Sequence, residues 1–228
     1  MPSNALAELM SGLAEIEALQ RANPSPLKGN ALKKPQIVRA IGRAEIVLLS
    51  SHFERYIYAI NEEAVEAVCD SAAKAYSLPE SLRLHHARPV IDLIAATSWE
   101  NRSKLLAEYS ANEGWLWEPN AEIVRLEASR LLEWMKAPSP KSLVRVFRIW
   151  GIHDIFRSIT RKSTISSQLR LRIEELVSKR NNIAHGDFTV EATYLDVVQY
   201  KSAVRTFCGR VDRKFSQQLK SIIGSAPW

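Results

Sequence analysis

The spacing of the apolar residues is the feature that most limits the folds open to this chain. Most of them recur at steps of three and four residues instead of alternating, and the 228 residues include only 8 glycines. Steps of three and four bring side chains to one face of an α-helix, whereas alternation is typical of β-strands. With 46% hydrophobic residues the chain can bury a full core. The sequence therefore predicts a single all-α domain over residues 1–228.

The same spacing predicts where the helices lie. We expect helices over Asn4–Gln20, Pro35–Tyr76, Val90–Ser110, Asn120–Lys136, Leu143–Trp150 and Ser166–Ala184, and a long last helix that includes Val204 and Ile222. Pro24, Pro26 and Gly29 indicate a loop after the first helix. A second loop is expected over Gly114–Pro119, and its two tryptophans are predicted to plug into the helical core.

The cysteines and the hydropathy of the chain indicate which cellular compartment to expect for the protein. Cys69 and Cys208 are the only cysteines, and their separation fits neither a disulfide framework nor a zinc site. Residues 1–10 lack the basic and apolar regions of a leader, and no apolar run approaches the length that crosses a bilayer. We therefore expect a soluble, cytoplasmic protein with no metal, cofactor or membrane partner.

Charge is distributed unevenly along the chain. Residues 139–228 contain 16 Lys and Arg against 7 Asp and Glu, so this part carries about +9, whereas residues 1–138 carry about −3. A local excess of this size is expected of a protein that binds a polyanion such as RNA. Lysines and arginines that coat solvated helix faces are the alternative interpretation.

The segment Arg180–Gly186, with the sequence RNNIAHG, carries the clearest chemistry. Arginine can stabilise the charge of a phosphoryl transition state and histidine can transfer protons, so the pair can cleave RNA without a metal. Arg180 is predicted near the centre of an apolar stripe, where a guanidinium needs a partner or a wet cleft. The stripe is formed by Leu169, Ile173, Leu176, Ile183 and Ala184.

His185 is expected to point away from Arg180, by about 140° on an ideal helix, at the place where Gly186 ends the helix. One protomer would then not aim both side chains at one phosphate. Two protomers with facing motifs would bring them together, which favours a homodimer.

These residues resemble a known family. Arg180, polar Asn181 and His185, followed by glycine and placed between two long helices, resemble the R-X4-6-H signature of the HEPN superfamily. The segment Ser51–Tyr56, with the sequence SHFERY, is similar to stand-alone prokaryotic HEPN proteins of the RiboL-PSP type. The resemblance implies a HEPN-like antiparallel helical bundle with a core over residues 35–77 and 139–223 and a helical insertion over residues 78–138.

The resemblance to active members of the family also implies an activity, catalytic residues and partners. They are metal-independent endoribonucleases of defence and toxin systems, with a composite site at a homodimer interface. By this resemblance Arg180 and His185 are the catalytic pair and Asn181 is the polar helper. The expected partners are RNA, a second copy of the chain, and an antitoxin or defence-system protein.

Two other functions compete with cleavage. One is a catalytically inactive HEPN module that binds nucleic acid or protein. The other is the toxin branch paired with a nucleotidyltransferase antitoxin, which typically has a tyrosine two residues after the motif histidine. This chain has Asp187 there, which argues against tyrosine AMPylation.

A second Arg-to-His spacing occurs at Arg148 and His153. Hydrophobic Ile149 follows the arginine and Gly151 interrupts the segment, so we interpret this match as accidental. After the main motif, Thr189 is expected to cap the last helix, with Glu191 soon after it.

The last helix is predicted to have two distinct faces. An apolar face is formed by Val204, Cys208, Val211, Phe215, Leu219 and Ile222. A basic face is formed by Arg210, Arg213, Lys214 and Lys220 and could follow RNA phosphates, although a solvated face fits equally well.

The remaining candidates lie earlier in the chain. His52 and Glu54 are on the predicted long helix, where Glu54 is expected to be a structural partner of an arginine or to support the site. His85 and His86, near Arg88, are interpreted as a surface turn and not as a metal site.

Overall fold

The computed structural model describes residues 1–23 and 35–228. In these ranges the chain forms helices and no β-strand: α1 (Asn4–Ala22), α2 (Pro35–Cys69), η3 (Ala75–Ser77), α3 (Glu80–Ala96), α4 (Trp99–Glu113), η4 (Gly114–Trp117), α5 (Ala128–Leu132), α6 (Pro140–Ile149), α7 (Ile155–Ser158), α8 (Ser163–Ala184) and α9 (Tyr194–Ile223). The all-α fold predicted from the apolar spacing is confirmed. The predicted loop at Pro24, Pro26 and Gly29 lies outside the described residues.

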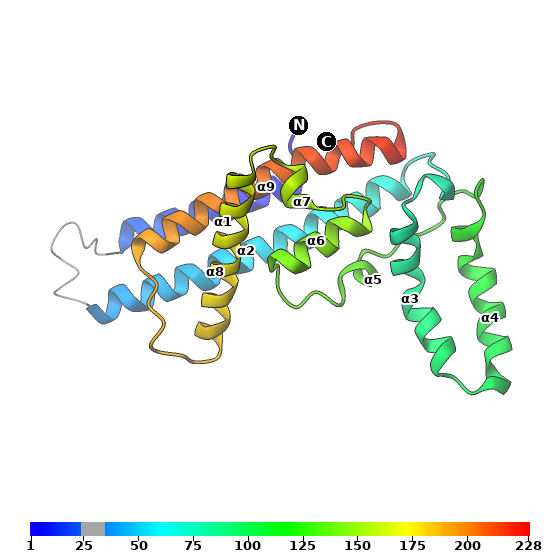
Figure 1. The fold of residues 1–228 in the computed structure, drawn as a ribbon, viewed down its shortest axis with the longest axis horizontal. Coiled ribbons are helices and arrows are strands. Elements are labelled where there is room, and N and C mark those ends of the chain that lie inside the picture. The colour runs from blue at the N-terminus through cyan, green and yellow to red at the C-terminus, as the bar shows by residue number, and fades with distance from the viewer. Residues whose placement is uncertain (24–34) are drawn as a thin grey trace.

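Three long helices form the body of the molecule. Helices α1, α2 and α9 contact one another and run along its long axis, and α8 crosses them while packing on α2 and α9 (Figure 1). Short helices α6 and α7 both contact α8, and α6 also contacts α3 and α5 (Figure 1). The bundle thus includes α1, which the predicted core over residues 35–77 and 139–223 left out.

Aromatic residues join these helices in the core. Phe207 of α9 lies edge-on to Phe53 of α2, with ring centres 5.9 Å apart, and contacts Phe156 of α7 at 5.0 Å. Trp150, fully buried after α6, packs on Phe215 and donates its indole N–H to Asn61 Oδ1 at 2.7 Å. Burial of each such side chain stabilises the fold by about 1.5–3 kcal/mol. Helices α2, α7 and α9 and the end of α6 are therefore joined by one aromatic core.

The predicted apolar face of α9 is confirmed, because all six of its residues are buried. The long early helix is shorter than predicted, since α2 ends at Cys69 and not near Tyr76. The reason is local: the Ser71 hydroxyl donates to the Val68 carbonyl at 2.7 Å, which satisfies the helix end and turns the chain.

Residues 80–113 form a hairpin of α3 and α4 that projects from the body (Figure 1). The continuous helix predicted over Val90–Ser110 was wrong. The chain turns at Thr97 and Ser98, where the Arg102 guanidinium donates to the Thr97 and Ala95 carbonyls at 2.9 Å. No residue of α4 is buried, so this helix of the hairpin keeps its apolar side chains at least partly in solvent.

The helix predicted over Asn120–Lys136 was also wrong, because only Ala128–Leu132 is helical. Two residues before it, Ala121 and Glu122, are bound by distant partners in an isolated β-bridge. The Ala75 N–H donates to the Ala121 carbonyl at 3.0 Å, and Lys74 pairs with Glu122 at the same distance. A long-range contact therefore overrides the helical spacing here.

The loop between α4 and α5 is anchored by a different residue from those predicted. Leu116 is fully buried, whereas Trp115 is half-buried and Trp117 is 40% exposed. The Trp117 indole N–H donates to the Tyr109 hydroxyl at 2.7 Å, so its polar edge stays near the surface. Among the described residues, no helix is both long and apolar enough to span a bilayer.

Candidate active site

Helix α8 carries the Arg180–Gly186 motif in its last turn and at its end. Leu169, Ile173 and Leu176 are buried, as the predicted stripe requires, and they fix the rotation of the helix on the bundle. The stripe stops earlier than predicted: Ile183 is half-buried and Ala184 is exposed. The last turn of α8 therefore lies at the edge of the core, where side chains reach both protein and solvent.

Arg180 faces α2 from this last turn. Its side chain is 34% exposed, and its guanidinium lies 3.8 Å from the Glu54 carboxylate. It also donates to Asn181 Oδ1 at 3.2 Å. The guanidinium is thus paired on one side and open to solvent on the other, so it has donors left for an anion. Arg180, Asn181 and Glu54 are brought together by the fold.

His185 lies just beyond the helix, as its C-cap residue, and is exposed. Gly186 follows with φ of 83°, in the left-handed region that favours glycine. The Gly186 N–H donates to the Ile183 carbonyl and the Asp187 N–H to the Asn182 carbonyl, at 3.1 and 3.0 Å. These two bonds form a Schellman motif. The backbone of the histidine is therefore fixed while its imidazole stays in solvent.

The segment after the motif is held against α2. Arg43 donates to the Asp187 carbonyl at 3.0 Å, and its guanidinium lies 5.2 Å from the centre of the Phe188 ring. Gly42 approaches the same segment so closely that a Cβ placed there would be 2.3 Å from the Ala192 carbonyl oxygen. A side chain at residue 42 would thus push this segment away. The motif loop is positioned by α2 as well as by α8.

The cap of α9 differs from the prediction. Thr193, and not Thr189, caps the helix, in a capping box with Asp196. Thr189 instead donates its backbone N–H and hydroxyl to Asp187 Oδ1, at 2.9 and 2.6 Å, and these bonds lower the pKa of the Asp187 carboxyl. Lys179 links the two helices, since it contacts the Glu191 carbonyl at 3.0 Å and Asp196 at 2.7 Å.

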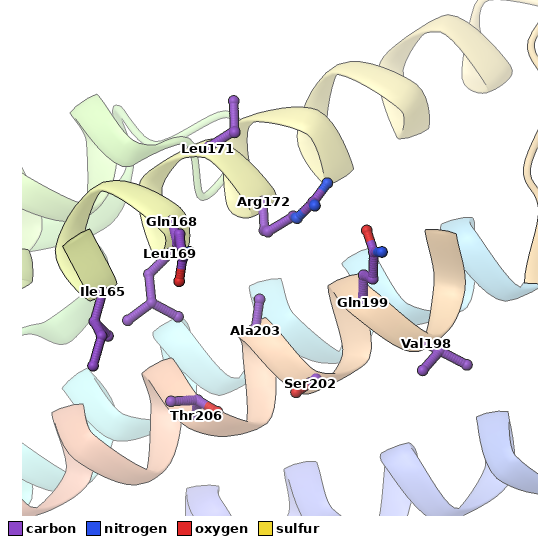
Figure 2. Close-up of a pocket in the computed structure, with 10 residues that line it drawn as sticks. All are labelled: Ile165, Gln168, Leu169, Leu171, Arg172, Val198, Gln199, Ser202, Ala203 and Thr206. Carbon is purple, nitrogen blue, oxygen red and sulfur yellow. The ribbon is translucent and has the colours of Figure 1, made fainter. Parts of the chain in front are cut away.

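A groove of about 660 Å³ separates the first half of α8 from α9 (Figure 2). Ile165, Leu169 and Arg172 point from α8 toward α9, whereas Leu171 points away from it. Its lining is aliphatic or small and polar, with Arg172 as its one ionisable side chain. The groove therefore holds no acid–base pair.

The predicted basic face of α9 is not beside the motif. Arg210, Arg213, Lys214 and Lys220 lie in the second half of α9, toward the C-terminus, whereas the motif lies at the far end of α8 (Figure 1). Arg213 and Lys220 are exposed, and Arg210 and Lys214 are half-buried. RNA would have to extend along the body to reach both places.

The other histidines have structural surroundings. His52 pairs with Glu15 of α1 at 3.1 Å. His86 is not in a surface turn, as predicted, but is buried in α3, where it accepts the Glu127 N–H at 3.1 Å. Burial lowers the pKa of His86, which keeps it neutral. At the second Arg-to-His spacing, Arg148 only contacts the His153 carbonyl, at 3.3 Å.

Sequence reasoning missed Gly42, Arg43 and Lys179. One signal was present, because an isolated glycine inside a helix often marks a close approach of another backbone. The partners of Arg43 and Lys179 lie in the segment 186–196, and no spacing rule connects them to it.

Comparison with known proteins identifies the family of the chain. The family model RiboL-PSP-HEPN matches residues 8–217. The chain therefore belongs to the RiboL-PSP-HEPN family, within the HEPN group of all-α domains associated with RNA. No curated protein and no solved structure gives a match. The match begins within α1 and continues through residues 78–138, so the division of the domain into core and insertion stays a prediction.

Proposed function

We propose that this protein is a metal-independent endoribonuclease. The observation that supports the proposal is the end of α8, where a half-buried arginine with free donors stands five residues before an exposed histidine on a fixed turn. Arginine is suited to the pentavalent phosphorane and histidine to proton transfer near neutral pH. This pair supplies both requirements of transesterification.

In the proposed mechanism, His185 removes the proton of a ribose 2′-OH, and the resulting oxygen attacks the adjacent phosphate. Arg180 stabilises the negative charge that builds on the phosphorane, while Asn181 and Glu54 hold its guanidinium. A second His185, from another copy of the chain, protonates the leaving 5′-oxygen. The P–O5′ bond breaks, and the products have 2′,3′-cyclic phosphate and 5′-OH ends.

Exposed apolar side chains near the motif support a homodimer as the active unit. Phe188 is 88% exposed directly after the motif, and Tyr194 and Leu195 at the start of α9 are also exposed. Large apolar side chains exposed within ten residues of the motif fit a surface that another protein covers. A second copy is the occupant that also supplies the second histidine, which makes the site composite.

The test is to incubate the purified protein with total RNA in EDTA and to map the new ends. Cleavage should continue in EDTA and leave cyclic phosphates. RNA with a 2′-deoxy or 2′-O-methyl group at the cut site should resist, because the nucleophile is missing. Activity that returns only with Mg²⁺ or Mn²⁺, or equal cleavage of DNA, would contradict the mechanism.

One observation favours a second candidate, an inactive HEPN module that binds nucleic acid or protein. Asp187 is two residues after His185, and its hydrogen bonds to Thr189 lower its pKa, so it is negatively charged at neutral pH. That charge disfavours a phosphate close by. Its removal in Asp187→Asn should raise cleavage if the site is active, and should change only binding if it is not.

The biological setting proposed for the nuclease is a defence or toxin–antitoxin system, in which an antitoxin or another defence protein restrains it. The family assignment supports this setting. Coexpression with the product of an adjacent gene should suppress cleavage if that product is the antitoxin. The control is a misfolded variant of that product. If it suppresses RNA cleavage equally well, the restraint is not specific.

A further inference from the structure

A second cleft surrounds the start of α8, at the opposite end of this helix from His185. Its volume is about 510 Å³, and it is lined by three arginines, four hydroxyl side chains and one aspartate. The helical rise places Ser163, at its rim, about 25 Å from Arg180. The cleft is thus separate from the motif, and none of the residues of the proposed mechanism lines it.

The cleft has an excess of positive charge. Its one carboxylate, Asp154, contacts the Arg170 guanidinium at 2.6 and 2.8 Å and also accepts the Phe156 N–H. Asp154 is therefore neutralised within the protein. Arg157 is exposed, at 3.7 Å from Asp154, a distance at which a surface pair contributes little. Arg161 is exposed and, in the part of the chain that the structure describes, has no ion-pair partner.

The N-terminal end of α8 adds to the positive electrostatic potential of the cleft. Lys162 is the N-cap of α8, and its side chain makes no capping hydrogen bond. The N–H groups of the first turn therefore point outward without a side-chain acceptor, at the positive end of a helix of 22 residues. Such an end attracts an anion when other donors accompany it.

Ser166 gives an independent indication of a ligand. It lines the cleft and is only 7% exposed, and its hydroxyl, which keeps access to solvent, makes no hydrogen bond to the protein in the described ranges 1–23 and 35–228. Its backbone N–H is already bonded to the Lys162 carbonyl at 3.1 Å. A hydroxyl that opens into a cleft without a protein partner is free to donate to a ligand. A bound acceptor would complete it.

We propose that this cleft binds a phosphate group. Forked guanidinium groups, hydroxyls and free helical N–H groups are the donors that phosphate oxygens accept. The proposal of a phosphate site depends only on the residues of the cleft. The identification of RNA as the source of the phosphate rests on the proposed function. An RNA strand cut at His185 would place a phosphate of a distant nucleotide here, whereas a free nucleotide would offer the same group.

The test compares the wild-type protein with an Arg157→Ala/Arg161→Ala variant. Lys104→Ala/Lys141→Ala is the control, because it removes the same charge from two exposed lysines elsewhere. Each protein is titrated with inorganic phosphate and with AMP while the amide NMR signals of residues 163–167 are followed. Each is also titrated with 2′-O-methyl RNA, which resists cleavage, as a dinucleotide and as a strand long enough to span α8.

Phosphate should shift the amide signals in the wild type and the control but not in the arginine variant. Affinity for the long RNA should fall about 10-fold in that variant, and the slope of log K against log salt should decrease by about 1. The dinucleotide is too short to reach the motif and the cleft together, so its affinity should fall less than that of the long RNA. Ser166→Ala, which removes only the hydroxyl, should weaken phosphate binding about 3- to 10-fold. This variant replaces the double variant in the test if the double variant fails to fold.

Equal phosphate shifts and RNA affinities in the arginine variant and the control would overturn the proposal. Shifts with phosphate and AMP but unchanged affinity for long RNA would support the cleft and assign it to a free nucleotide. Cleavage is a separate measurement: an inactive protein that keeps the phosphate-dependent shifts would contradict the nuclease and leave the phosphate site standing.

Discussion

The Arg180 guanidinium and the Glu54 carboxylate lie 3.8 Å apart where the last turn of α8 crosses α2. This separation holds the arginine in place without the short bidentate contact that would occupy two of its five donors. The pairing also explains how a charged side chain can lie on the apolar stripe of α8. Glu54 is therefore expected to position Arg180, and its replacement should cost less activity than loss of the arginine.

Arg180→Ala and His185→Ala should each reduce RNA cleavage about 10²-fold or more, because each removes charge stabilisation or proton transfer. Both residues lie at the edge of the core, so the variants should fold. The measurement is single-turnover cleavage of a labelled RNA. Arg148→Ala is the matched control, since the Arg148–His153 pair has the same spacing, and equal losses in all three variants would refute the assignment.

The active unit is predicted to be a dimer with a shared site. Heterodimers that pair a wild-type protomer with an Arg180→Ala/His185→Ala protomer test this, because they hold one intact motif. A composite site needs groups from both chains, so activity should fall about 10²-fold. Half of the wild-type rate would instead mean that each chain forms a complete site. Loss of activity on dilution below the dimer dissociation constant is the accompanying measurement.

The basic face of α9 makes a separate prediction about RNA. If Arg210 and Arg213 contact phosphates, Arg210→Glu/Arg213→Glu should flatten the dependence of RNA affinity on salt by about 0.7 per lost contact on a single strand. The dissociation constant is measured by anisotropy over a series of salt concentrations. A parallel but weaker binding curve, with the slope unchanged, would mean that these arginines only coat a solvated surface.

Glu45 predicts an effect of pH on stability. It is fully buried in α2, its carboxyl oxygens have no hydrogen-bond partner among the described residues, and burial raises its pKa to about 7 while Lys201 opposes the shift. Between the ordinary value of 4.5 and about 7, the folded state binds a proton that the unfolded state does not. The free energy of unfolding should therefore decrease as pH rises through this window.

Glu45→Gln should remove this dependence. The variant should be about 1–3 kcal/mol more stable than the wild type at pH 8.5 and nearly equal at pH 5, as measured by urea unfolding. Glu66→Gln, an exposed position on the same helix, is the control and should change stability by less than about 0.5 kcal/mol. An equal gain at both pH values would mean that packing, and not ionisation, is responsible.

The buried face of a helix could be predicted from the sequence wherever the pattern lies within that one helix. The apolar residues of α8 and α9 recur over many turns, so their buried faces could be predicted, and the need of Arg180 for a partner followed from its place on such a face. Residues 120–127 also have a helical spacing, but Ala75 and Lys74, which precede α3, bind Ala121 and Glu122 in an isolated β-bridge. A periodicity contains no information about such a partner.

The arrangement of the motif loop was beyond sequence reasoning for the same reason. Arg43 and Asp187 are 144 residues apart, and their contact exists only after α2 and α8 have crossed. Spacing rules act over a few turns of one helix. They could identify Arg180 and His185 as candidates but could not identify the residues that hold the loop behind them.

Gly42 links the middle of a helix to the geometry of the motif. Alanine would normally strengthen α2 at this position, since glycine inside a helix costs about 1 kcal/mol. Here even a methyl group would collide with the Ala192 carbonyl. A genetic screen for loss of activity would therefore return substitutions at residue 42, although this residue offers RNA no functional group. Such a variant would look like a damaged active site while every residue of the motif remained intact.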